Sequence, residues 1–104
     1  MNRKEDALSL VDEMATMANT NQLNAIGYQL LGMGEYDKAI KYFKLNVKNN
    51  PQNANVFDSL GEAYKTIGDK KNAIKNLKKA LSLNPGPGVK ANSEKLLAEL
   101  GVTN

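Results

Sequence analysis

Apolar residues recur along this chain with the spacing of amphipathic helices. In the stretch FDSLGEAYKTIGDKKNAIKNLKKALSLNP (57–85), Phe57, Leu60, Gly61 and Tyr64 follow the i, i+3, i+4, i+7 spacing of one helical stripe. After a break, a second stripe contains Ala73, Ile74, Leu77, Ala80 and Leu81. The pattern therefore predicts two consecutive amphipathic helices.

The residues between and after these stripes predict where the helices end. Gly68 can adopt the left-handed conformation that stops a helix, and Asp69 is a good N-cap for the next one. Pro85 cannot continue a helix and disfavours helical geometry at Asn84 before it. We therefore expect a hairpin of two helices that ends near Pro85.

The same design occurs twice. A shift of 34 residues aligns residues 21–51 with residues 55–85. The shift superposes Gly27 on Gly61, Gly34 on Gly68, Ala39 on Ala73, Ile40 on Ile74, and Asn50-Pro51 on Asn84-Pro85. In the first copy Glu35 stands where the second has Asp69, and glutamate is a poorer cap.

Gly61 lies inside a predicted helix, where glycine costs about 1 kcal/mol relative to alanine. Two helices approach to about 8 Å only where the side chains at their crossing are small. We expect Gly61 to meet Ala73, and Gly27 to meet Ala39. The larger residues expected on either side of these contacts are Leu30, Phe43, Tyr64 and Leu77.

These residues resemble the tetratricopeptide repeat family, whose 34-residue unit has this small–large–small pattern and terminal proline. The resemblance covers two repeats, 20–53 and 54–87. It implies an all-α fold in which tandem helix-turn-helix repeats form a short right-handed superhelix. Asn46 departs from the family, which usually has alanine there, as Ala80 does in the second repeat. We expect a looser contact at Asn46.

A helix is predicted on each side of the repeats, so that residues 1–104 form a single domain. Two repeats alone would leave both end faces open. Residues 88–101 predict a capping helix with an apolar stripe of Val89, Leu96, Leu97 and Leu100. Residues 3–18 predict an amphipathic helix with Ala7, Leu10, Val11, Met14 and Met17 or Ala18 near one face. This N-terminal helix is expected to pack on the first repeat; the alternatives are a missing parent domain or a second copy of the chain.

The composition argues against an enzyme and against a metal or cofactor site. The chain has no cysteine and no histidine, which removes the thiolate nucleophile and the commonest general base and metal ligand. No glycine-rich phosphate-binding motif occurs. The acidic pair Asp58 and Glu62, at i and i+4 on one predicted helix, is expected to be polar helix surface. We expect no catalytic residues and no cofactor.

The N-terminus is charged where a signal peptide needs an apolar stretch, and no apolar run reaches the roughly 20 residues needed to cross a bilayer. The cytoplasm is the expected location, unless the chain is a fragment of an exported parent.

The lysines are concentrated on the second helix of each repeat, which in the family faces the convex side. Such a surface could attract nucleic acid or an anionic membrane. However, the lone arginine is Arg3, and no aromatic residues interleave with the lysines as stacking platforms would. We therefore do not expect nucleic acid as a partner.

The resemblance also implies a concave groove lined by the first helix of each repeat. Carried over residue by residue, this surface consists of Asn21, Asn24, Tyr28, Leu31, Asn55, Asp58, Glu62 and Lys65. Its amides suit a peptide backbone, Tyr28 beside Leu31 offers an apolar anchor, and the two acids favour a basic or neutral ligand. The expected function is non-catalytic binding of a protein, through a peptide or helix in this groove. The alternative at these positions is the plain surface of a spacer.

Two finer resemblances bear on the partner. Some family members hold the C-terminal carboxylate of heat-shock chaperones in a basic clamp, but its positions carry Asn24, Tyr28 and Ser59 here, so this ligand is not expected. Residues 23–64 also resemble repeat tails of microbial β-lactamase-like serine hydrolases. This second resemblance supports an alternative function as an accessory or dimerising domain of a larger parent. We expect a monomer or a weak homodimer.

Overall fold

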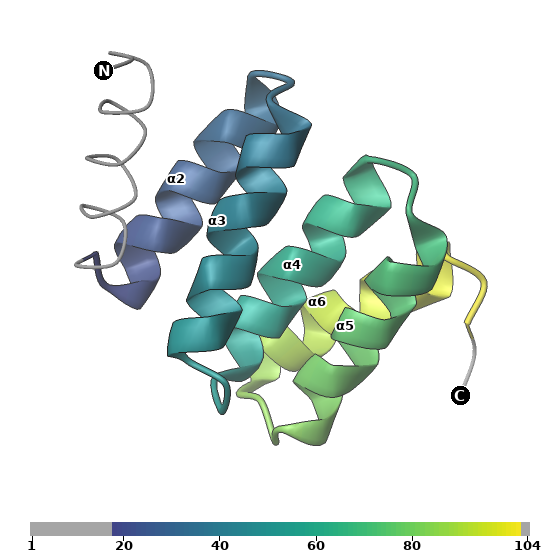
Figure 1. Ribbon diagram of the computed structural model, residues 1–104. Helices are drawn as coiled ribbons and strands as arrows, with labels where there is room; N and C mark the ends of the chain where they lie inside the picture. The colour runs from purple at the N-terminus through teal and green to yellow at the C-terminus, as the bar shows by residue number, and fades with distance from the viewer. Residues whose placement is uncertain (1–17, 103–104) are drawn as a thin grey trace, which may run out of the picture.

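The computed structural model describes residues 18–102, and within this range the chain forms helices and no strands (Figure 1). The prediction of an all-α fold is confirmed. The helix predicted for residues 3–18 lies, except for Ala18, outside the described residues. The helices are α2 (Thr20–Gly32), α3 (Tyr36–Asn49), α4 (Ala54–Thr66), α5 (Lys70–Ser82) and α6 (Pro87–Glu99).

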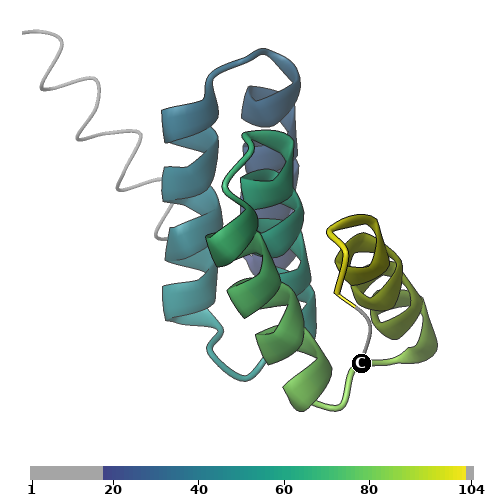
Figure 2. The ribbon, with the colours of Figure 1, turned by 90° about the vertical axis from the view of Figure 1, so that its right-hand side faces the viewer.

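The helices form two consecutive hairpins and a final single helix. Helix α2 packs on α3, and α4 packs on α5 (Figure 1). The two hairpins meet where α4 contacts both α2 and α3. Helix α6 packs against α4 and α5, and Figure 2 shows it on the far side of the second hairpin from α3. The first helices of the hairpins, α2 and α4, and the final helix α6 therefore follow one another along one side of the array.

The turns after α2, α4 and α6 share one geometry. Gly34, Gly68 and Gly101 have φ angles of +81°, +88° and +85°. In each turn the residue after the glycine donates its backbone N–H to a carbonyl five residues earlier, at 2.9 Å every time. This hydrogen bond satisfies one of the carbonyls left free at the helix end. The predicted stops at Gly34 and Gly68 are confirmed, and α6 ends in the same way.

The helix N-caps also behave as their residue types predict. The Asp69 carboxylate accepts the backbone N–H of Asn72 at 3.2 Å and the side-chain amide of Asn72 at 2.7 Å. These hydrogen bonds, the side-chain bond first, lower the pKa of Asp69 below its usual value. Glu35 caps α3 without a side-chain hydrogen bond. The difference between the two caps that the sequence predicts is therefore confirmed.

Gly27 and Gly61 both lie at close contacts, but the nearest neighbour of each is a large side chain rather than the expected alanine. A Cβ atom on Gly61 would lie 2.7 Å from Leu77 Cγ, whereas Ala73 contributes only its carbonyl oxygen, at 3.3 Å. A Cβ on Gly27 would lie 2.7 Å from the ring of Phe43. The large side chains thus lie directly over the glycines, because each glycine provides the space that a bulky core residue fills.

The looser contact expected at Asn46 is wrong. The Asn46 side chain is only 1% exposed, and its amide nitrogen donates to the Thr20 carbonyl at 3.0 Å. Its amide oxygen accepts from the side chain of Asn50 at 2.9 Å. Asparagine at this position therefore ties the C-terminal half of α3 to the start of α2, a link that alanine could not make.

Candidate functional site

Three polar contacts join the first helices of the array to one another. The Tyr28 hydroxyl of α2 donates to the Glu62 carboxylate of α4. Asp58 of α4 accepts hydrogen bonds from α6, and Lys65 of α4 pairs with Glu99 of α6 at 3.2 Å. We call these three contacts the polar ladder. Each step of the ladder links residues one repeat length apart, which sets α2, α4 and α6 in register.

The middle step of the ladder buries an acidic residue that we had assigned to the groove. Asp58 is 5% exposed, and its two carboxylate oxygens accept from Ser93 Oγ at 2.6 Å and from the Asn92 amide at 2.8 Å. Ser93 is itself fully buried. The carboxylate is therefore used to hold α6 against α4, and it has little surface left for a ligand.

Tyr28 occupies the first step of the ladder and also contributes to the core. Its ring packs edge-on against Phe43, with centroids 5.1 Å apart and an interplanar angle of 77°. Burial of the hydroxyl, followed by its hydrogen bond to Glu62, raises the pKa of Tyr28 well above its usual value. The hydroxyl therefore stays protonated near neutral pH and remains a donor to Glu62.

The remaining groove residues are less engaged. Asn21 is exposed, while Asn24, Leu31 and Asn55 are half-buried. Within residues 18–102, none of these three asparagines makes a hydrogen bond through its side chain, and the buried Oδ1 atom of Asn24 has no partner. Leu31 packs at the edge of the core cluster that contains Phe43. Asn21, Asn55 and Leu31 keep free polar or apolar surface, whereas the unpaired amide oxygen of Asn24 is buried beside them. We call these four residues the groove face.

Sequence reasoning missed the α6 side of the ladder. Asn92 and Glu99 follow Asp58 and Lys65 by one repeat length, so extending the repeat shift past residue 87 would have found them. The signal was weak because residues 88–101 match the repeats in few other positions.

No group of three or more His, Cys, Asp or Glu residues within residues 18–102 could hold a metal ion. None of the helices in the described range is long and apolar enough to cross a membrane.

Two tandem matches to the family model for the tetratricopeptide repeat cover residues 23–53 and 54–87, one for each hairpin. The chain belongs to the tetratricopeptide repeat family. Repeats of this family are protein–protein interaction modules and are typically non-catalytic.

The chain is similar to parts of two longer tetratricopeptide repeat proteins. It is 39% identical over 61 residues to cellulose synthase operon protein C of Escherichia coli (strain K12), a match covering 59% of this chain and 5% of that protein. It is 34% identical over 92 residues to Tetratricopeptide repeat protein 13 of Homo sapiens, covering 83% of this chain and 11% of that protein. The chain thus spans a small fraction of either relative. Neither name is that of a hydrolase, so the resemblance to hydrolase tails is not confirmed.

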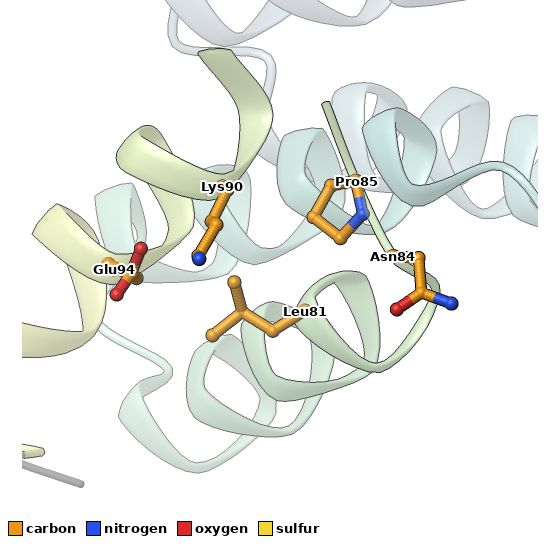
Figure 3. Close-up of a pocket in the computed structure, with 5 residues that line it drawn as sticks. All are labelled: Leu81, Asn84, Pro85, Lys90 and Glu94. Carbon is orange, nitrogen blue, oxygen red and sulfur yellow. The ribbon is translucent and has the colours of Figure 1, made fainter. Parts of the chain in front are cut away.

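A hollow lies between the end of α5 and the first half of α6. Figure 3 shows its lining residues, with Lys90 and Glu94 on α6 and Leu81, Asn84 and Pro85 at the end of α5 and in the turn after it. The volume of the hollow is about 330 Å³.

Proposed function

We propose that the chain binds a peptide or a helix of a partner protein on the groove face. The observation that carries this proposal is the set of asparagine side chains at Asn21, Asn24 and Asn55 that make no hydrogen bonds within the described chain. An amide side chain can donate and accept at once, and a peptide backbone needs both a donor and an acceptor. The three amides lie on α2 and α4, which contact each other.

The ligand on this face is recognised by amides and an apolar contact rather than by charge. Asp58 and Glu62 were expected to favour a basic ligand, but both already have hydrogen-bond partners inside the chain. Lys65 likewise pairs with Glu99. Leu31 offers partly exposed apolar surface for one side chain of the ligand. The groove face therefore suits a peptide of low net charge.

Crosslinking can test which face meets the partner. A photo-reactive amino acid would be placed at Asn21 or Asn55, and at Lys44 or Lys71 on the second helices as a control, in the full chain exposed to a cell extract. We expect protein adducts from the first two positions. The variant Asn21→Arg/Asn55→Arg should remove them, because two long charged side chains would cover the amides.

The matched control is Gln29→Arg/Asn49→Arg, which adds the same charge at two other exposed positions. It should leave the adducts unchanged, and circular dichroism should show the same helical content in both variants. Adducts that form only at Lys44 or Lys71, or that survive the groove variant, would refute the proposal.

A second candidate is an accessory or dimerising domain of a larger parent, possibly a hydrolase. It is favoured by the small share of each relative that this chain covers. The surface at issue is then the predicted helix 3–18, which lies outside the described residues. Leu10→Asp/Met14→Asp would disrupt docking to a parent domain or to a second copy, while the groove variant would not. Sedimentation of the two variants at several concentrations would show which of them reduces self-association.

A further inference from the structure

Helix α5 carries charge of one sign only. Its lysines are Lys70, Lys71, Lys75, Lys78 and Lys79, and it contains no acidic residue. Of the ion pairs within residues 18–102, one involves Lys38 and the other Lys65, so no lysine of α5 is paired with a carboxylate there. Lysines spaced four apart on a helix repel one another. Such a helix is stabilised when an acidic partner lies along it.

A hollow of about 450 Å³ lies beside these lysines. Phe57 of α4 contributes to its lining, together with Lys75, Lys78 and Lys79 and the polar residues Asn76 and Ser82 of α5. Phe57 is 8% exposed, and the Lys79 amino group lies 5.9 Å from the centre of its ring. The lysine side chains bring their methylene stems to the hollow and keep their amino groups near water. The site therefore combines apolar walls with a basic rim.

The hollow arises from a difference between the two repeats. In the first repeat, Leu23 is fully buried, with Tyr42 and Leu45 packed against it in one cluster. One repeat length later, Phe57 takes the place of Leu23, and Asn76 and Lys79 take the places of Tyr42 and Leu45. An asparagine is much smaller than a tyrosine, so space remains beside Phe57. The second repeat thus lacks the side chains that fill the same place in the first.

We propose that this hollow binds an acidic segment of a partner protein, with one apolar side chain seated against Phe57 and carboxylates paired with Lys75, Lys78 and Lys79. Opposite charge and the apolar wall together specify this occupant. Nucleic acid fits less well, because Phe57 is too buried to stack on a base and the chain's one arginine, Arg3, lies elsewhere in the sequence. The site is separate from the groove face, so this interaction is additional to the proposed function.

The test uses the full chain and a fluorescein-labelled peptide made of aspartate and glutamate with one central leucine. Fluorescence anisotropy should show binding that weakens as salt is added. The variant Lys75→Glu/Lys79→Glu should weaken binding at least about tenfold, since it reverses two charges at the rim. Replacing the leucine by serine in the peptide should weaken it by about tenfold as well, since the apolar contact with Phe57 is lost.

The control variant Lys90→Glu/Lys95→Glu changes the net charge equally but on α6, and it should bind the leucine peptide within about twofold of the unmodified chain. The groove variant Asn21→Arg/Asn55→Arg should do the same. Should Lys75→Glu/Lys79→Glu lose helical content, Lys75→Gln/Lys79→Gln takes its place. The proposal is overturned if the α6 control loses as much affinity for the leucine peptide as the α5 variant does, or if the leucine and serine peptides bind equally well. It is also overturned if a single-stranded oligonucleotide or anionic vesicles bind more tightly than the leucine peptide.

Discussion

The close contact at Gly61 makes a quantitative prediction with an internal control. Gly61→Ala would place a methyl group 2.7 Å from Leu77 Cγ, well inside van der Waals contact, and Leu77 is fully buried. Overpacking of this kind costs about 1–3 kcal/mol. The higher helix propensity of alanine stabilises the folded state by about 1 kcal/mol. We therefore expect Gly61→Ala to lower the free energy of unfolding by about 0–2 kcal/mol.

Gly32 provides the opposite case. It lies in α2 within the same fold, and a Cβ added there would meet nothing within 4 Å. Gly32→Ala should therefore gain up to about 1 kcal/mol from helix propensity alone. The two substitutions are chemically identical, but Gly61 lies inside α4 against Leu77, whereas Gly32 is the last residue of α2 and has open space around it. Because 1 kcal/mol shifts the melting temperature of a small domain by about 4–8 °C, their difference is measurable.

Thermal and urea unfolding followed by circular dichroism would measure both changes. A third variant tests the cause: with Leu77→Ala in the background, Gly61→Ala should lose its unfavourable part and become neutral or stabilising. The contact argument is wrong if Gly61→Ala raises the melting temperature as much as Gly32→Ala does. It is also wrong if the Leu77→Ala background leaves the effect of Gly61→Ala unchanged.

Three further predictions concern the polar contacts. Asp58→Ala should lower the free energy of unfolding by about 2–3 kcal/mol, because it leaves the buried Ser93 hydroxyl unpaired. Hydrogen exchange should then show α6 opening before the rest of the array. Asn46→Ala should lower the free energy of unfolding by about 1 kcal/mol through loss of the bond to the Thr20 carbonyl, measured by urea unfolding; a gain in stability would contradict the role given to Asn46. The lowered pKa of Asp69 means that its capping contribution is present above its ordinary value of 3.8 and is lost as the pH falls through the lower folded value. Asp69→Asn keeps a capping side chain without an ionisable group, so acid titrations of stability should differ between the two proteins below that pH.

The fold could be predicted from sequence because its determinants are local. The stops at Gly34 and Gly68 and the cap at Asp69 depend on the backbone preferences of single residues. The repeat then showed which stripes belong to equivalent helices. These signals need no knowledge of which side chains meet.

The contacts between helices could not be predicted in the same way. Gly61 was correctly expected at a close crossing, yet its nearest neighbour is the Leu77 side chain, and Ala73 contributes only its carbonyl oxygen. Spacing along one helix indicates which face is buried, but the rotation of the partner helix decides which side chain lies opposite. Asn46 is a second example, since its effect depends on the position of the Thr20 carbonyl 26 residues away in sequence.

The candidate site was only partly visible in the sequence. The family pattern indicated the positions on α2 and α4, but not which of them were already occupied. Asp58 and Lys65 are bound by residues of α6, whose sequence follows the repeat pattern poorly. The free surface therefore became apparent only once α6 had been placed.

The polar ladder also has a mechanical consequence. Its steps are unequal: the hydrogen bond between Asp58 and Ser93 is buried, whereas the side chains of the Lys65–Glu99 pair are 31% and 40% exposed. Dissolved salt weakens an exposed ion pair far more than a buried hydrogen bond. The array should therefore be stiff near Asp58 and more compliant near Glu99, with α6 pivoting about its buried contacts. Ionic strength should then change the curvature of the row formed by α2, α4 and α6 and leave the helices themselves intact.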